Sequence, residues 1–360
     1  MPVDGTGITR FSRWERYVVD KKLIELIDKA MSRRSFMARS GAAAAVAVVA
    51  GCGGSSTPAP TPAPTPTPTP TPAPVVLGDS DYLNFALNLE YLEAEFYLRA
   101  ATGSGLSATD TGNATTTVTV PSTTMIPGLT TAQQNYLFEI AQNELDHVRF
   151  LRSALASDAV TRPDIDLMNS FNAAASAAGI GSSFNPFGSY EAFLVGAFVF
   201  EDVGVTAYHG AAGLLSNTAT GKTYLAAAAS ILAVEAYHAA EIRTLLIADS
   251  VATATKTSTL VTPNPTYVTY ANQISKLRAT LGGGAETALT ALPPYAIPFV
   301  STAYMPASSI VACDPTNSIA YARSTDEVLH IVYAAPPGAG VKGGGFFPNG
   351  MTGNISVTAS

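Results

Sequence analysis

Residues 141–151 read AQNELDHVRFL, and residues 233–243 read AVEAYHAAEIR. Each stretch has a Glu followed three residues later by a His, namely Glu144 with His147 and Glu235 with His238. Residues i and i+3 share one face of an α-helix, so each pair directs a carboxylate and an imidazole toward the same point. Apolar residues recur on that face at helical spacing, which predicts two amphipathic helices whose polar residues lie where core residues belong.

Two further predicted helices carry a Glu seven residues before a Tyr, namely Glu90 with Tyr97 and Glu201 with Tyr208. Here too the Glu lies within the apolar stripe. Asp79 or Ser80 is the predicted N-cap of the first helix. The other three are predicted to run from Thr130 or Thr131 to about Ala156, from about Ser189 to Leu215, and from about Gly221 to Ala248. The order Glu, Glu-x-x-His, Glu, Glu-x-x-His is therefore an internal repeat of two helix pairs.

Six side chains of this repeat are predicted to point into a common core: Glu90, Glu144, His147, Glu201, Glu235 and His238. Four carboxylates and two imidazoles form the mixed oxygen and nitrogen set that a pair of iron or manganese ions requires, and both metals accept it. Four negative charges also offset two divalent ions, whereas without metal the buried carboxylates would repel one another. We therefore expect two Fe or two Mn ions as cofactors.

Four segments carry a family resemblance: residues 87–97 (LNLEYLEAEFY), 200–209 (FEDVGVTAYH), 236–243 (AYHAAEIR) and 343–355 (GGGFFPNGMTGNI). They resemble the ferritin-like superfamily of di-metal carboxylate proteins, in its bacterial and fungal branch related to plant desiccation-related proteins. The resemblance implies an all-α, ferritin-like four-helix bundle with a long crossover between the second and third helices. It also implies that the six side chains of the repeat are the metal ligands.

Four neighbouring side chains receive expected roles. Glu93 follows Glu90 on nearly the same face, so it is an alternative ligand or a neutralising neighbour, and the Glu-to-Tyr spacing favours Glu90 as the ligand. Tyr97 and Tyr208 are the candidate catalytic residues, because they could hydrogen-bond ligating carboxylates. Packing as large aromatic side chains in the core explains them equally well. Asp202 could orient a ligating His through its second nitrogen, or lie in solvent.

The first helix pair contains an extra Thr-, Ser- and Gly-rich segment at residues 102–128. The alternation of Thr116, Val118 and Val120 within it predicts a small β-hairpin. Residues 251–360 form a predicted, mostly irregular extension that packs on the bundle. These additions would crowd the outside of a closed storage shell, which disfavours a ferritin cage.

Within the extension, two short helical stretches are predicted, at residues 267–281 and 326–332. Phe346 and Phe347 precede a Pro and are expected to fill a hydrophobic groove on the bundle. Neither stretch contains a catalytic signature.

Residues 1–52 form a predicted export signal. They hold nine Lys or Arg and five Asp or Glu, which leaves 11 basic and 22 acidic residues for the rest of the chain. Arg33 and Arg34 precede a short apolar run of small residues, an arrangement that resembles a twin-arginine signal. Residues 49–52 (VAGC) resemble a lipobox, so Cys52 is the predicted lipid anchor. Two starts remain open, Met1 with an unusual helical extension or Met31.

Residues 53–78 form the predicted linker. Pro alternates with Thr or Ala from Ser55 to Pro74, which favours extended polyproline II and a semi-rigid spacer. The bundle is expected at residues 79–250. We expect a periplasmic or cell-envelope lipoprotein, with the outer membrane favoured because Gly53 follows the anchor.

Composition limits the function. The net charge of −7 argues against nucleic acid as a partner, and two Cys exclude a disulfide-rich or Cys-rich zinc scaffold. The favoured function is redox chemistry with O2 or peroxide in stress protection, by a peroxidase, a catalase-like enzyme or a ferroxidase. The alternatives are metal binding or iron storage without turnover, and a structural desiccation-related protein without metal. The expected partners are O2 or peroxide, a membrane through the lipid anchor, and a second copy of the chain as a candidate homodimer.

Overall fold

The computed structural model describes residues 76–252, 255–257, 260–262, 266–284, 286–289 and 310–360. All of them belong to one compact unit, residues 72–360. The predicted signal, with Cys52, and nearly all of the linker lie outside the described residues, so both stay predictions.

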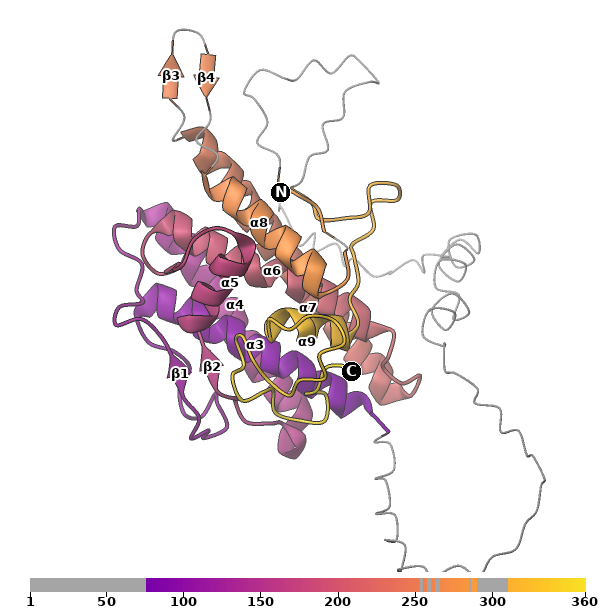
Figure 1. Ribbon diagram of the computed structural model, residues 1–360. Coiled ribbons are helices and arrows are strands. Elements are labelled where there is room, and N and C mark those ends of the chain that lie inside the picture. Colours follow the sequence, from indigo (N-terminus) through magenta and orange to yellow (C-terminus); the bar gives the residue numbers. More distant parts are fainter. Residues whose placement is uncertain (1–75, 253–254, 258–259, 263–265, 285, 290–309) are drawn as a thin grey trace, which may run out of the picture. The chain divides into compact units, whose positions relative to one another are not determined.

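Four long helices form two hairpins (Figure 1). α3 (Asp79–Thr102) packs along α4 (Thr131–Leu155), and α6 (Tyr190–Ala212) packs along α7 (Ala219–Ala252). α3 also contacts α6, so the two hairpins meet through the most buried helix of each. The all-α bundle is confirmed. Thr130 and Ser189 cap α4 and α6 by accepting a hydrogen bond from the third following amide, which agrees with the predicted starts.

The start of α3 differs from the prediction. Gly78 is the N-cap, not Asp79 or Ser80, and its amide donates to Oδ2 of Asp81 over 2.7 Å. Asp79 instead accepts hydrogen bonds from the amide and hydroxyl of Ser216, both over 2.7 Å. Asp79 therefore joins the start of α3 to the loop before α7, because its acceptors are taken by another part of the chain.

The 34-residue helix α7 is long and apolar enough to cross a membrane by length and composition, over Ala219–Ala248. It nevertheless packs along α6 and buries Glu235, His238 and Arg243. In the bundle these groups lie against side chains of other helices, whereas a surface facing lipid would leave them in hydrocarbon. We interpret α7 as a bundle helix.

The crossover between α4 and α6 corrects the predicted hairpin. It contains the 3₁₀ turn η1 (Ala156–Asp158), the strand β2 (Ile165–Asp166) and the helix α5 (Asn169–Ala178). In the extra segment, β1 (Val118–Thr119) pairs in parallel with β2, with Val118 opposite Ile165. Residues 116–120 therefore do not fold back on themselves, because the crossover supplies their partner strand.

Arg162 ties this insertion to the bundle. Its Nη1 lies 2.5 Å from Oε1 of the fully buried Glu95 of α3, and its Nη2 donates to the carbonyl of Thr116 over 2.5 Å. The hydroxyl of Thr116 donates in turn to the carbonyl of Arg162. The extra segment is thus fixed to α3 by a buried ion pair.

The helices of the extension after α7 lie on the bundle (Figure 1). The described elements of the extension are the antiparallel pair β3 (Thr255–Thr257) and β4 (Leu260–Thr262), the helix α8 (Thr266–Leu281) and the helix α9 (Thr325–Val332). α8 packs on α5, α6 and α7, and α9 packs on α6 and α8. The two helical stretches predicted in the extension are confirmed to within one residue at each end.

Phe346 fills an aromatic groove, as expected. Its ring lies 5.1 Å from that of Phe171 in α5 and 4.9 Å from that of Phe200 in α6. Phe347 packs instead against Tyr333, after α9. The tail is also held at the start of the bundle, because Asn88 of α3 donates to the carbonyl of Thr352 and accepts from its amide.

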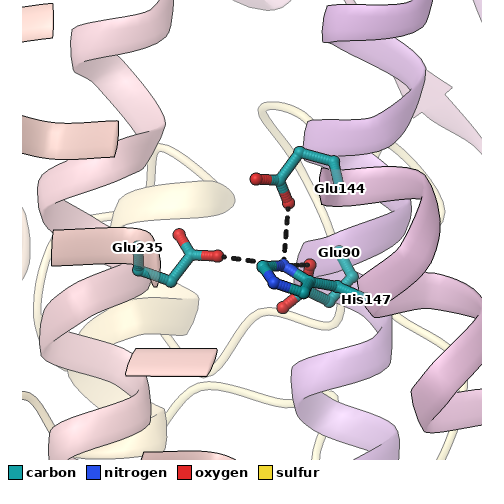
Figure 2. Close-up of side chains that lie close together, drawn as sticks. All are labelled: Glu90, Glu144, His147 and Glu235. Carbon is teal, nitrogen blue, oxygen red and sulfur yellow. Dashed lines mark hydrogen bonds and ion pairs between the residues drawn. The ribbon is translucent and has the colours of Figure 1, made fainter. Parts of the chain in front are cut away.

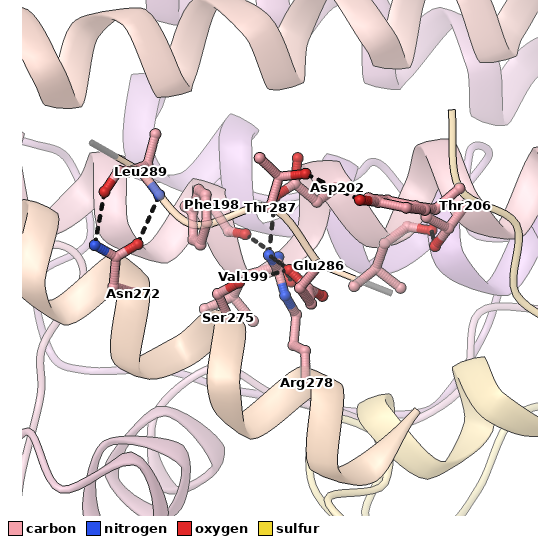
Figure 3. A network of polar contacts seen from close by, with 12 residues as sticks. Phe198, Val199, Asp202, Thr206, Asn272, Ser275, Arg278, Glu286, Thr287 and Leu289 are labelled. Atoms are coloured by element: carbon pink, nitrogen blue, oxygen red, sulfur yellow. Dashed lines mark hydrogen bonds and ion pairs between the residues drawn. The ribbon is translucent and has the colours of Figure 1, made fainter. Parts of the chain in front are cut away.

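A buried polar network joins α6, α7 and α8 (Figure 3). Arg278 of α8 donates to the carbonyl of Phe198 over 2.5 Å and lies 2.9 Å from Asp202 and 2.7 Å from Glu286. Arg323 contacts the other oxygen of Glu286 over 2.7 Å. The extension is therefore attached to the bundle by buried ion pairs as well as by aromatic packing.

We predict that Phe346→Ala lowers the free energy of unfolding by about 3–5 kcal/mol, because it leaves a cavity between α5 and α6. Phe138→Ala is the matched control: its side chain is 49% exposed, against 4% for Phe346. The control should change stability by less than about 0.5 kcal/mol. Chemical denaturation followed by circular dichroism measures both, and equal effects would contradict the packing described.

Glu286 makes a pH-dependent contribution. Burial alone would raise its pKa, but the charges of Arg278 and Arg323 lower the pKa below the ordinary value of 4.5. The stabilisation is therefore complete above pH 4.5 and is lost as the pH falls through the lowered pKa. We predict that Glu286→Gln costs about 3 kcal/mol at pH 7, and that its difference from wild type shrinks below pH 4.5. The exposed Glu139→Gln serves as control; a pH-independent difference would contradict this account.

Candidate metal centre

The bundle brings the six side chains of the repeat together. Each of the four long helices contributes, with one Glu from α3 and from α6 and a Glu-x-x-His pair from α4 and from α7. All six are at most 9% exposed: Glu90, Glu144, His147, Glu201, Glu235 and His238. Their assignment as metal ligands stays a prediction, but their convergence in a buried site is a property of the structure.

One group surrounds His147 (Figure 2). Its Nδ1 lies 3.2 Å from Oε2 of Glu90, 3.5 Å from Oε2 of Glu144 and 3.4 Å from Oε1 of Glu235. One ligand atom from each of the four side chains lies within 4.8 Å of the others. This arrangement of three carboxylates and one imidazole can hold a cation.

A second group surrounds His238. Its Nδ1 lies 2.9 Å from Oε1 of Glu144 and 3.6 Å from Oε2 of Glu201. Glu144 thus turns one oxygen toward each imidazole and belongs to both groups. The imidazole rings of His147 and His238 have centroids 6.4 Å apart. A carboxylate shared between two adjacent ligand groups is suited to bridging two ions.

The two tyrosines hold the outer carboxylates reciprocally. The hydroxyl of Tyr97, on α3, donates to Oε1 of Glu201 on α6. The hydroxyl of Tyr208, on α6, donates to Oε1 of Glu90 on α3. Each Tyr therefore braces the Glu of the opposite helix, and the seven-residue spacing found in the sequence corresponds to a crossed pair of hydrogen bonds.

The donor set fits a metal pair. Five carboxylate oxygens, on Glu144, Glu201 and Glu235, are buried without a hydrogen bond of acceptable geometry, and so is Nδ1 of His238. Among the described residues, no Lys or Arg forms an ion pair with these groups. Unsatisfied buried acceptors and a concentration of negative charge are costly in a core. Divalent cations would satisfy both, and Glu and His are the ligands that iron and manganese take.

The pKa values of the clustered side chains reflect the same excess of negative charge. Burial raises the pKa of Glu90 to about 8 and raises that of Glu235. Burial would also raise the pKa of Glu144, but the two imidazoles, which lie 3.5 and 2.9 Å from its oxygens, lower it to about 2. The carboxylates overcome the effect of burial on His238 and raise its pKa to about 10, and they raise that of His147 further. The carboxylates thus favour protons on the two imidazoles, and cations bound by the same groups would compete with those protons.

Glu93 lies beside the site and joins neither ligand group. It is 4% exposed, and burial raises its pKa well above the ordinary value. In the repeat, its counterpart on α6 is Gly204, three residues after Glu201. A Cβ added to Gly204 would lie 2.5 Å from Oε2 of Glu235 and 3.3 Å from Oε1 of Glu93. The glycine therefore makes room for both carboxyl groups.

Asp202 does not act as expected. Its carboxylate contacts neither imidazole and is 5% exposed, so it is not a solvated acid either. Oδ2 lies 2.6 Å from Arg243 and 2.9 Å from Arg278. The side chain of Glu201 points into the bundle, whereas that of Asp202 lies between Arg243 of α7 and Arg278 of α8, so one of its partners comes from the extension.

Sequence analysis missed Asn143, whose Oδ1 lies 3.1 Å from Nε2 of His238. Asn143 directly precedes Glu144, but its partner lies 95 residues later on α7. The only signal was its place on the side of α4 next to the Glu-x-x-His face.

The bundle is similar to a known family of protein domains. A family model of the ferritin-like domain matches residues 78–248, which span the four long helices. The fold of these residues is an all-α, ferritin-like helical bundle.

Two known proteins are similar over most of their length. The ferritin-like catalase Nec2 of Nesocodon mauritianus is 28% identical over 294 residues, which cover 77% of this chain and 85% of the relative. The desiccation-related protein PCC13-62 of Craterostigma plantagineum is 28% identical over 264 residues, which cover 71% of this chain and 78% of the relative. The alignments thus extend beyond the domain itself.

We predict that Glu144→Gln removes bound metal, because it takes the shared carboxylate from both groups. His238→Ala should remove at least the ion held by its own group. Glu139→Gln, at an exposed position on the same helix, is the control and should keep the wild-type metal content. Mass spectrometry of metals in the purified proteins measures the outcome. A full metal complement in Glu144→Gln would show that the site is assigned wrongly.

Proposed function

We propose that this protein binds two iron or manganese ions in the bundle and uses them for redox chemistry with peroxide or O2. Disproportionation of hydrogen peroxide is the favoured reaction. The observation that carries the proposal is the buried cluster with two ligand groups sharing Glu144. The catalase activity in the name of one relative supports the choice of peroxide.

When bound, a pair of such ions would supply a reversible two-electron couple. In the overall reaction, one peroxide takes up two electrons and two protons to give two waters, and a second peroxide gives up the same number to yield O2. The chain contributes position. Tyr97 and Tyr208 fix the outer carboxylates through their hydroxyls, and the closely packed apolar walls keep bulk water from the cluster.

The physiological role that we propose is protection against oxidative or drying stress. Similarity to a desiccation-related protein supports it. Removal of peroxide is a reaction from which a drying cell would benefit.

The first test combines metal content with peroxide consumption for the mature chain. We expect about two iron or manganese ions per chain, and O2 release in the ratio of one for every two peroxides consumed. Glu144→Gln should lose both, whereas Glu139→Gln should keep both. Metal without turnover would replace the proposal with metal binding or storage, and no metal would leave a structural bundle.

We also propose that the protein is exported by the twin-arginine route and anchored through Cys52 in the cell envelope, with the outer membrane favoured. The paired Arg33 and Arg34, the following apolar run and the Pro-rich spacer support this proposal. In a bacterial host, Cys52→Ala should move the protein from the membrane to the soluble fraction, and changing both arginines to Lys should block export. Membrane association of Cys52→Ala at the wild-type level would contradict the anchor.

A second copy of the chain is the further partner that we propose. The outer face of α7 supports it, because Tyr237 is 74% exposed and Leu225 41% exposed. Sedimentation of the mature chain distinguishes a dimer from a monomer or a larger shell.

A further inference from the structure

The two halves of the internal repeat differ at the position that precedes each Glu-x-x-His pair. The residue before Glu144 is Asn143, whereas the residue before Glu235 is Val234. Both positions lie one residue before the Glu of a Glu-x-x-His pair, so they occupy equivalent places on α4 and α7. Asparagine offers a hydrogen-bond acceptor there, and valine offers none.

The structure shows what this difference does. Oδ1 of Asn143 lies 3.1 Å from Nε2 of His238, while Nδ1 of the same imidazole faces Glu144 and Glu201. By the repeat, the residue that would face Nε2 of His147 is Val234. Within the described residues no hydrogen bond to that nitrogen is formed, and the side chain of His147 is 11% exposed against 5% for His238.

A hydrogen bond at one nitrogen of an imidazole determines what the other nitrogen can do. When Nε2–H donates to the Asn143 carbonyl oxygen, Nδ1 carries the lone pair and can bind a cation. The same bond fixes the rotation of the ring. The contact with Asn143 thus favours the binding tautomer and orientation of His238, whereas the ion pairs of His147 within the described residues are all with carboxylates.

We infer that Asn143 is a positioning residue that makes the two metal positions inequivalent, by strengthening the position formed by Glu144, Glu201 and His238. The inference rests on the metal centre proposed above. Asn143 does not touch the ions itself. Its effect is confined to the position that contains His238, and among the described residues no side chain gives corresponding support to the position that contains His147.

The test is the release of Mn²⁺ from manganese-loaded protein to an excess of chelator, followed by the electron paramagnetic resonance signal of the ions. In wild type, the two ions should leave in two separate phases. Asn143→Val introduces the residue found in the other half of the repeat. It should lower the affinity for one of the two ions by about 10- to 100-fold. The second ion should leave at its wild-type rate.

Two further variants separate positioning from general loss of structure. Asn143→Asp keeps an acceptor at the same place and should retain the slow phase. Val234→Asn supplies an acceptor to the other half and should slow the release of the ion beside His147 by a similar factor. Thermal unfolding of each metal-loaded variant shows whether the bundle is intact.

The outcomes separate this inference from the proposed function. Wild type that binds no Mn²⁺ would overturn the metal centre and the inference with it. Wild type that binds two ions, with both phases unchanged or equally accelerated in Asn143→Val, would overturn the inference alone. Asn143→Asp behaving like Asn143→Val would also overturn it, since the hydrogen bond would then not be the cause.

Discussion

The structure depends on burying like charges. Four carboxylates lie at most 1% exposed in the centre of the bundle, and only two imidazoles accompany them. Such a cluster is unfavourable in a low-dielectric core unless cations or protons compensate it. The rest of the domain makes the arrangement tolerable: two crossed tyrosine hydrogen bonds fix the outer carboxylates, a glycine leaves room for Glu235 and Glu93, and a dense apolar core surrounds them. Divalent cations bound at this site would compensate the buried negative charge.

Local sequence predicted the bundle and the residues that converge in it. The helical period predicts that Glu144 and His147 share a face. The common direction of each Glu and His pair therefore follows from their three-residue spacing. Four such faces in a repeat can meet only in one core. The predicted N-cap of α3 was wrong because Asp79 accepts a hydrogen bond from Ser216, a distant contact that the local sequence does not indicate.

The parts that sequence did not predict all depend on partners from distant segments. Alternating residues at 116–120 indicated a strand, but not that its partner would be the crossover strand β2. Asp202 looked like an aid to the metal site until α8 supplied Arg278. Asn143 looked like an ordinary polar residue of a helix, because its role is visible only when His238 of α7 lies against it. Pairings across 41 to 95 residues are set by tertiary packing and not by period.

The contact between Asn88 and Thr352 joins residues that are 264 positions apart. Bringing such distant segments together costs loop-closure entropy that local helix formation does not, so this contact is expected to form late in folding. During synthesis, α3 leaves the ribosome long before the tail that covers it. The first helix of the site therefore keeps part of its surface uncovered until Thr352 and its neighbours have been synthesised. The completion of the carboxylate cluster's surroundings is consequently linked in time to the synthesis of residues 343–355.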